Sequence, residues 1–375
     1  MSSQACWESG LYEIVFRFAS QLERLELEGF ESISLPPLSF PRLRSLCISD
    51  SFESDHAENP HFDAPHLDAP CLREVFLRYG PVKQLQASLP KTQLTKLHLL
   101  ADLADCLAFV AHTPNLVELQ IFCDDTGHLD SPSSTFIVLP HLCSILLGVG
   151  PSVDMIQYLT LPALDRLEIS VDEDSDDVAN FVDDLVTRSA CTLRQLDLCL
   201  HQAESWWLPN FLDSIPLHSL QDLTLRAPDD VALSDLWLDV AGTRLPALKS
   251  LAIRECQFHV NLAELVDTLA ARTKEVPGVA RLKSFQLSFG VDRRMGGRPG
   301  DVEIKSPSKS DPQVKDALNK LHDLRAQGLR IDIRSKLETL SSGNIDSKIV
   351  RTPLLATEKD ASLTISYFLL TFALD

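Results

Sequence analysis

The sequence of 375 residues lacks the short motifs by which many enzyme active sites are recognised. It contains no G-x-S-x-G, no G-x-x-x-x-G-K-[S/T], no H-E-x-x-H and no G-x-G-x-x-G segment. These patterns mark a hydrolase nucleophile, a phosphate-binding loop, a zinc-protease helix and a dinucleotide-binding turn. We therefore expect no catalytic residues, no cofactor and no bound metal, and we interpret the chain as a non-enzymatic protein.

Basic residues are scarce relative to acidic ones. The chain has 34 Lys and Arg against 53 Asp and Glu, which gives a net charge of −19. Such a protein is repelled by phosphate backbones and by anionic lipid surfaces. No apolar run is long enough to span a bilayer. We therefore expect neither nucleic acid nor a membrane as the main partner.

The nine cysteines show no pairing pattern, because none of them forms a C-x-x-C motif and their number is odd. The first residues show no basic segment followed by an apolar run, so no secretory signal is expected. Scattered cysteines in apolar surroundings are typical of buried free thiols in a reducing compartment. The sequence thus predicts a soluble protein of the cytoplasm or the nucleus.

One short pattern, L-x-x-L-x-L with Leu, Ile, Val or Phe at the apolar positions, occurs eleven times. Its copies begin at Leu22, Leu43, Leu72, Leu94, Leu116, Leu142, Leu164, Leu193, Leu220, Leu248 and Leu282. Successive copies start 21 to 34 residues apart. Most of these distances match the length of a leucine-rich repeat, which is about 20–29 residues. A single copy would mean little, but this series indicates a repeat protein.

The pattern predicts one short strand per repeat, because apolar and other residues alternate along x-L-x-L-x. The leucines point into the protein, and the residues between them lie on the opposite face. Parallel strands need a connection that crosses back over the sheet. We therefore predict an α/β fold, a leucine-rich-repeat solenoid (horseshoe) with a parallel sheet on its concave side and helices or 3-10 turns on its convex side.

The repeats divide the chain into five predicted segments. These are an N-terminal capping helix at 1–20, eleven repeats at 21–291, a flexible Gly/Pro/Ser-rich loop at 292–310, a closing helix and strand at 311–334, and a C-terminal tail at 335–375. Residues 177–189 and 261–272 carry apolar side chains at helical spacing, so both predict helices. For the tail, the sequence is compatible with disorder and with docking on the last repeat.

One departure from ordinary repeats concerns the turn that follows each strand. Asn or Cys normally stands three residues after the last apolar residue of the pattern and satisfies backbone groups there. In this chain only Cys256 fits, although Asp102, Asp124 and Asp172 could substitute. We therefore expect these turns to be less regular than in an ideal solenoid.

Four stretches resemble a particular class of repeat protein. They are FVDDLVTRSACTLRQLDL from Phe181, ELVDTLAARTKEVPGVARLKSFQLSF from Glu264, the recurrent LPALxxLxI, and the closing KLHDLRAQGLRIDI. They look like the leucine-rich-repeat portion of fungal F-box proteins, especially the large mushroom-type families. The resemblance covers roughly residues 20–334. In such proteins an F-box binds the Skp1 adaptor of a ubiquitin ligase, and the repeats present a substrate.

The resemblance implies an intracellular protein–protein interaction scaffold, the substrate-recognition module of an SCF ubiquitin ligase. The residues before Leu22 show no Leu-Pro-rich F-box segment, so no Skp1-binding residue can be carried over and Skp1 binding is in doubt. The alternatives are a free-standing regulatory or inhibitor protein and a diverged paralogue without function. In every case we expect a monomer whose protein ligand the sequence does not identify.

The expected ligand site is the concave strand face, the default binding surface of a curved solenoid. The candidate protein-binding residues lie between the leucine positions: Arg78, Lys96, Glu118, Phe122, Leu146, Arg166, Glu168, Asp197, Arg226 and Arg254. Apolar exceptions, which also include Phe76 and Leu100, gather in repeats three to six. This pattern fits a mixed-charge strip with an apolar centre. It fits equally a solvated sheet face whose apolar residues are covered by loops.

Two segments contain potential metal ligands. His56, His61 and His66 lie in one segment, in which His61 and His66 belong to a tandem P-H-x-D-A repeat. The prolines of this repeat favour an extended loop that places successive histidines on opposite sides. The alternative, a metal-dependent enzyme, would need this loop. Residues 172–177 are acidic like a calcium loop, but Asp177 stands where glycine is required. We therefore favour a solvated loop and a charged helix start, respectively.

Two further features have a functional and a structural interpretation. Trp206 and Trp207 in a convex-side connection could anchor a partner, but packing beneath the connection is favoured. Ser306-Pro307 with Lys309 resembles a proline-directed phosphorylation site, a match that often occurs by chance.

Overall fold

The computed structural model describes residues 15, 17–28, 33–34, 39–49, 62–63, 67–78, 82–123, 136–171, 177–200, 207–226, 236, 240, 244–256, 262–289, 312–335 and 362–366. The chain forms two compact units. We call Met1–Ala163 with Val350–Asp375 the N-terminal unit, and Leu164–Ile349 the C-terminal unit.

All eleven copies of the repeat pattern form a strand, and each strand begins two residues after the first leucine of its copy. In the N-terminal unit they are β1 (Arg24–Glu28), β3 (Ser45–Ser49), β5 (Glu74–Arg78), β6 (Lys96–Leu100), β7 (Glu118–Phe122) and β9 (Ser144–Leu147). In the C-terminal unit they are β11 (Arg166–Val171), β12 (Gln195–Leu200), β13 (Asp222–Arg226), β14 (Ser250–Cys256) and β15 (Ser284–Phe289). The predicted strand periodicity is thereby confirmed.

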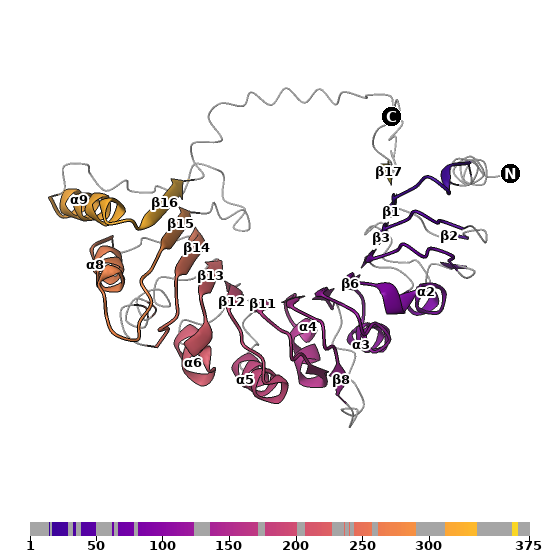
Figure 1. The fold of residues 1–375 in the computed structure, drawn as a ribbon, viewed down its shortest axis with the longest axis horizontal. Helices are drawn as coiled ribbons and strands as arrows, with labels where there is room; N and C mark the ends of the chain where they lie inside the picture. The colour runs from indigo at the N-terminus through magenta and orange to yellow at the C-terminus, as the bar shows by residue number, and fades with distance from the viewer. Residues whose placement is uncertain are drawn as a thin grey trace, which may run out of the picture. The chain divides into compact units, whose positions relative to one another are not determined.

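Within each unit the strands pair in parallel with their neighbours in sequence (Figure 1). The pairing is in register, so Leu97 and Leu99 of β6 lie beside Leu119 and Ile121 of β7. These residues are 0–2% exposed. Because the leucine positions of every repeat stack in this way, they form one continuous apolar core inside each unit. Both units thus have the architecture of a leucine-rich-repeat solenoid.

A backbone ladder fixes this register just before most of the described repeat strands. Two consecutive N–H groups donate to one carbonyl of the preceding repeat, as Thr95 and Lys96 do to the carbonyl of Arg73 at 2.9 and 3.0 Å. The same pair of bonds joins Gln221 and Asp222 to Arg194 at 2.8 and 3.0 Å. Side chains extend the ladder, since Asn115 Nδ2 donates to the carbonyl of Thr92 at 2.6 Å.

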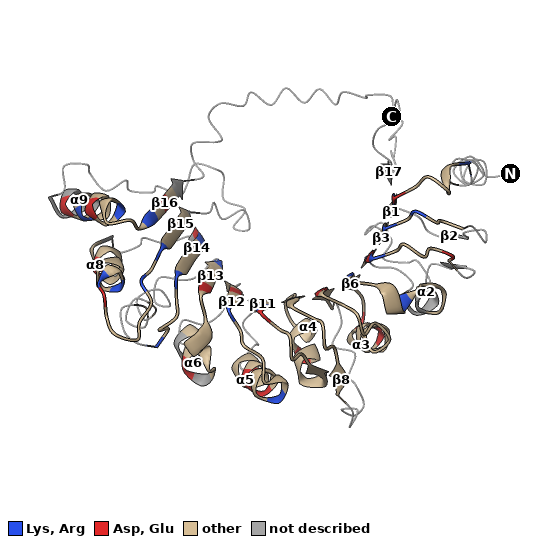
Figure 2. Cartoon of the chain, viewed as in Figure 1, with Lys and Arg blue, Asp and Glu red and all other residues tan. Residues whose placement is uncertain are grey.

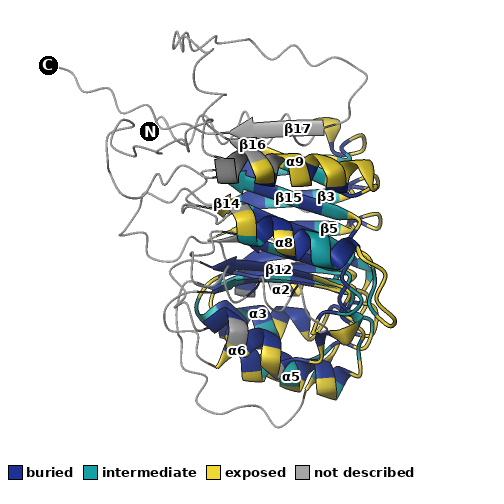
Figure 3. Cartoon of the chain, turned by 90° about the vertical axis from the view of Figure 1, so that its left-hand side faces the viewer, coloured by how far each residue is buried: buried dark blue, intermediate teal, exposed yellow. Residues whose placement is uncertain are grey.

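Helices cover one face of the sheet in each unit (Figure 1). They are α2 (Val82–Ser88), α3 (Leu103–Val110) and α4 (Pro151–Asp154), and in the C-terminal unit α5 (Val178–Ser189), α6 (Trp207–Ser214), α8 (Leu262–Thr273) and α9 (Pro312–Ala326). Single 3-10 turns span Lys91–Gln93, Met155–Tyr158 and Leu217–Ser219. Helices α5 and α8 carry buried residues on one side and exposed residues on the other (Figure 3). They confirm the two helices predicted from apolar spacing.

Some connections in the N-terminal unit contain short strands, which the sequence did not predict. Strand β2 (Ile33–Ser34) pairs with β4 (Phe62–Asp63), and β8 (Ile137–Val138) pairs with β10 (Leu159–Thr160). The β-branched residues of β2 and β8 favour extended backbone over helix. Helices and 3-10 turns are therefore not the only crossover in this solenoid.

The C-terminal unit ends in a helix and a strand, α9 and β16 (Arg330–Ser335). Gly328 ends α9 with a φ of 96°, a backbone conformation that glycine adopts without strain. The amide of Leu329 then donates to the carbonyl of Leu324 at 3.1 Å. Strand β16 pairs with β15, as expected for a closing half-repeat.

The described part of the C-terminal tail is the strand β17 (Ser362–Ser366). It pairs in parallel with β1, the first strand of the N-terminal unit. The tail was considered as a cap of the last repeat, but its strand extends the sheet beside the first.

The described cysteines are free, as predicted, but fewer are buried than expected. Cys106, Cys123 and Cys199 are buried, whereas Cys71 and Cys143 are exposed. The two exposed cysteines flank the first leucine of a repeat, and this turn faces solvent. The apolar surroundings suggest that all cysteines are buried. Among the described ones, this holds for Cys106 on a helix and for Cys123 and Cys199 near strand ends.

Several predictions fall on residues outside the described part of the chain. These are most of the capping helix at 1–20, the loop with His56, His61 and His66, the acidic residues 172–176, Trp206, Asp124, and the loop at 292–310 with Ser306. Of the tryptophan pair, Trp207 is 4% exposed and stacks on Phe211, with 4.6 Å between ring centroids. Packing beneath the connection is thus confirmed for Trp207.

Candidate functional site: the helix-free face of the strands

The side chains between the leucine positions form what we call the helix-free face, the sheet face opposite the helices. Each strand contributes two or three such residues, and the register aligns them in rows across neighbouring strands. In the N-terminal unit this face carries Arg78, Lys96, Glu118, Phe122 and Leu146. In the C-terminal unit it carries Arg166, Glu168, Asp197, Arg226 and Arg254.

Aromatic side chains meet in the middle of this face in the N-terminal unit. The ring of His98 on β6 lies between Phe76 on β5 and Phe122 on β7, with centroid distances of 5.6 and 5.4 Å. Leu100 is in register with Phe122, and Leu146 on β9 is in register with Gln120. We call Phe76, His98, Leu100, Phe122 and Leu146 the aromatic patch.

His98 is the most buried member of the aromatic patch, with 9% of its surface exposed. Burial lowers its pKa to about 4, and the nearby Arg78 guanidinium contributes to the shift. Desolvation has this effect because it disfavours the charged form of the imidazole. His98 is therefore neutral at pH 7, and it adds an uncharged ring to the patch.

The aromatic patch is bordered by a short row of charges. Lys96 Nζ lies 3.1 Å from Glu118 Oε2 and 4.0 Å from Glu74 Oε1. All three side chains are more than a third exposed, so water screens these pairs and they contribute little to stability. Their effect is to place charged groups along one border of the apolar centre.

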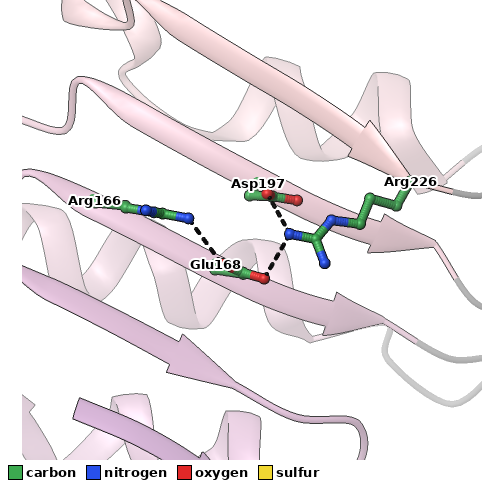
Figure 4. A network of polar contacts seen from close by, with 4 residues as sticks. All are labelled: Arg166, Glu168, Asp197 and Arg226. Carbon is green, nitrogen blue, oxygen red and sulfur yellow. Dashed lines mark hydrogen bonds and ion pairs between the residues drawn. The ribbon is translucent and has the colours of Figure 1, made fainter. Parts of the chain in front are cut away.

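A different arrangement occupies the helix-free face of the C-terminal unit, where both acidic and basic residues lie on the strands (Figure 2). Arg226 on β13 donates from Nη2 to Asp197 Oδ2 at 2.8 Å and to Glu168 Oε1 at 2.9 Å (Figure 4). Arg166 Nη2 donates to the other oxygen of Glu168 at 3.2 Å. We call Arg166, Glu168, Asp197 and Arg226 the ion-pair network.

The ion-pair network is partly withdrawn from water. The side chains of Asp197 and Glu168 are 9% and 12% exposed, and that of Arg226 is 32% exposed. Asp197 Oδ1 and Arg226 Nε are buried without a hydrogen-bond partner. Buried ionised groups are costly unless they are paired, so the network holds its side chains in place but leaves two polar atoms unsatisfied.

Arg254 on β14 extends this arrangement by one strand. It is in register with Arg226, and its Nε is also buried without a hydrogen-bond partner. Its neighbour along the row thus carries the same charge. The register places the two arginines at neighbouring backbone positions, and the side chain of Arg226 extends from there towards the carboxylates on β12 and β11.

The structure distributes the ten predicted residues over both units, five in each. It joins Arg166, Glu168, Asp197 and Arg226 in one network, which the sequence did not indicate. It also places His98 and Gly148 at the aromatic patch, and both were missed. His98 could have been found, because it occupies the middle helix-free position of LTKLHL.

The described residues contain no group of three or more His, Cys, Asp or Glu side chains placed to hold a metal ion. None of the helices in the described part of the chain is long and apolar enough to cross a membrane. No protein-family model matches the sequence, and no curated protein does.

Proposed function

We propose that this chain is a non-enzymatic protein-recognition scaffold that binds a protein ligand on the helix-free face of its strands. The observation that carries the proposal is the aromatic patch, where the ring of His98 contacts both Phe76 and Phe122 across three strands. The side chains at the equivalent positions of β11 and β12 are Glu168 and Asp197. Among these described strands, the aromatic centre thus lies on β5 to β7 and is replaced by acidic residues on β11 and β12.

The patch has the composition of an interface centre. Binding energy in protein complexes concentrates in a few large, well-packed side chains that are shielded by a polar rim. Phe122 and Leu146 are partly exposed, so a ligand could bury them further. Their apolar surface is bounded by Glu74, Lys96 and Glu118, which would set the orientation of the ligand more than its affinity.

The proposal is tested by capturing partners on the tagged full-length chain and on the variant Phe122→Ala. Phe136→Ala is the matched control, since Phe136 is 54% exposed and precedes β8, away from the strand face. We expect Phe122→Ala to lose partners that the wild type and the control retain. Direct titration with a purified partner then measures the loss, and equal affinities for all three proteins would contradict the proposal.

The resemblance to fungal F-box proteins supports a finer form of this proposal. The captured protein would then be a substrate that the repeats present to a ubiquitin ligase containing Skp1. Co-purification of Skp1 and cullin with the tagged chain would support this form. Capture of other proteins without Skp1 would instead favour a free-standing regulatory or inhibitor protein.

A further inference from the structure

We propose that the outer edge of β16 pairs with the outer edge of β17 from a second copy of this chain. In the C-terminal unit β16 is the last strand and pairs with β15 (Figure 1). In the N-terminal unit the strand at the end is β17, which pairs with β1. No other described strand covers the second edge of either one. The inference concerns self-association, so it goes beyond the proposed function and departs from the monomer that the sequence led us to expect.

An exposed apolar side chain on β16 is the first argument. Leu27 of β1 and Leu287 of β15 lie on strands that have a neighbour on each side, and both are 2% exposed. Ile333 of β16 is in register with Leu287, but its strand has one described neighbour and it is 43% exposed. A strand beside β16 would remove apolar surface of Ile333 from water, which favours association.

The sequence of β17 shows which kind of strand fits the end of such a sheet. It reads S-L-T-I-S, and its Leu363 and Ile365 are in register with the two core leucines of β1. Strand β16 reads R-I-D-I-R-S and has the same alternation. A β17 strand placed in register on β16 would therefore set Ile365 beside Ile333 and would continue the row of core residues by one strand.

The two uncovered edges are complementary. Every described pairing between repeat strands is parallel, and β17 precedes β1 in the stack as β16 follows β15. The outer edge of β16 is thus the kind that takes a following strand, and the outer edge of β17 is the kind that takes a preceding one. Two β16 edges with their core faces aligned would have to pair antiparallel, unlike any described repeat strands. A head-to-tail contact keeps the geometry of the repeats.

Neither strand carries the features that protect edge strands from association. Natural edges are blocked by proline, by lysine or by a charged residue at an inward position. Strand β17 has only hydroxyl and apolar residues. Strand β16 has charged residues, but they alternate with its isoleucines and so take the outward positions. The contact would therefore bring no like charges together.

The net charge of −19 on each copy opposes association at long range. The contact itself is nearly uncharged, since β17 has no charged residue and β16 has two arginines and one aspartate. At about 150 mM ionic strength, exposed charges more than about 8 Å apart are largely screened. We therefore expect association to be weak and to strengthen when salt is added.

Size-exclusion chromatography with light scattering on the full chain, from about 1 μM to about 500 μM, tests for such a weak contact. A heterologous contact leaves one free edge at each end of a pair. The mass of the wild type should therefore rise from 41.7 kDa past that of a dimer as the concentration increases.

The variant Ile333→Lys places a charge at the inward position of the edge, and it should weaken association about tenfold or more. Val276→Lys is the matched control. Val276 is 45% exposed in the turn between α8 and β15, so its replacement adds the same charge at a similarly exposed apolar residue. This control should associate as the wild type does.

Disulfide trapping locates the contact independently of Ile333→Lys. If the register continues across the contact, Arg330 of one copy lies beside Ser362 of the other, within the range of a disulfide. Mixing Arg330→Cys with Ser362→Cys under oxidised glutathione should give a linked pair with one chain of each variant. Mixing Arg330→Cys with Ser366→Cys, about 13 Å further along the strand, should give little. Each variant mixed with wild type controls for disulfides to the native exposed cysteines.

The inference is overturned if the wild type keeps a mass of 41.7 kDa throughout, if Ile333→Lys associates as tightly as the wild type, or if the mixed disulfide does not form. A double variant with Arg330→Cys and Ser362→Cys that links only within one chain would also overturn it, because β16 would then be covered by its own tail strand. Partner capture on the aromatic patch does not bear on these outcomes, since Phe122 is on neither edge.

Discussion

The ring of Phe122 lies directly against Gly148, so that a Cβ atom on Gly148 would stand 2.5 Å from Cδ1 of Phe122. We predict that Gly148→Ala displaces this ring and lowers the free energy of unfolding by about 1–3 kcal/mol, as overpacking does. The lower end is expected because Phe122 is partly exposed and can rotate. Urea unfolding measures the effect.

The double variant Gly148→Ala with Phe122→Leu separates this contact from other effects of the alanine. A smaller, flexible side chain leaves room for the new Cβ atom. Gly148→Ala should therefore cost less in the Phe122→Leu background than in the wild type. An equal cost in both backgrounds would show that the ring is not the obstacle.

The pKa of His98 predicts a pH-dependent stability. Its value of about 4 in the folded protein lies below the ordinary value of about 6.5, so the unfolded chain binds the proton more tightly. Stability is then fully present above pH 6.5 and falls as the pH decreases from 6.5 towards 4. The loss amounts to about 2–3 kcal/mol at the lower limit.

The measurement is urea unfolding of the wild type and of His98→Phe between pH 4 and 7.5. The difference between the two free energies of unfolding should decline below pH 6.5 and stay constant above it. Replacing Arg78 by Gln should raise the pKa of His98, since the Arg78 charge contributes to lowering it. A difference that does not change with pH would contradict the assigned burial of His98.

Arg226 is the shared donor of the ion-pair network, and its removal should be costly. Arg226→Ala leaves Glu168 and Asp197, both largely buried, without their common counter-ion. We expect the free energy of unfolding to fall by about 1–3 kcal/mol. The control is Arg194→Ala, because Arg194 pairs with Asp165 at 3.5 Å with both side chains exposed. A loss of about 0–1 kcal/mol is expected there, and equal losses would contradict the structural role of the network.

Thiol reactivity should follow the positions of the cysteines. Cys71 and Cys143 are exposed, whereas Cys106 is buried and its pKa is raised by its contact with the Cys123 thiol and by burial. We predict that iodoacetamide at pH 8 alkylates Cys71 and Cys143 of the native protein and spares Cys106 and Cys123. All four should react in denaturant, and peptide mass spectrometry distinguishes them. Early modification of Cys106 would contradict its place in the core.

Arg272 of α8 is 2% exposed, and its Nη2 donates to the carbonyls of Leu245 and Leu248 at 3.0 and 2.9 Å. Arg272→Ala leaves a cavity and two carbonyls without their donor, so it should cost about 2–4 kcal/mol. Arg272→Met fills most of the volume without a buried charge, so its cost should be smaller. Urea unfolding compares both with Arg281→Ala in the exposed turn before β15, which should have little effect.

The strands could be predicted because their signal is local. Leu97 and Leu99 alternate with Lys96 and His98, and this alternation alone predicts that the two leucines face the core. The two helices α5 and α8 carry an equally local signal. Strands β2 and β8 were missed because two residues are too few to show any periodicity.

The contacts on the helix-free face could not be predicted in the same way. Glu168 and Arg226 are 58 positions apart in the sequence, and their meeting depends on the register of β11, β12 and β13. Aligning the copies gives the register, but it does not show that the Arg226 side chain reaches back to Glu168 two strands away. The role of His98 could not be predicted for a related reason. A single polar residue does not show in the sequence that it packs between aromatic rings on the neighbouring strands.

The ladder that precedes most repeat strands has a consequence for how such a chain can change over generations. Most of the described repeat strands are held by hydrogen bonds to a carbonyl of the preceding repeat, as Lys96 is by that of Arg73. The number of residues in the intervening connection does not affect these hydrogen bonds. Insertions and deletions in the connections can therefore accumulate, as the distances of 21 to 34 residues between repeats show, while the alignment of side chains on the opposite face is inherited unchanged. The helix-free face and the connections can thus change independently of each other.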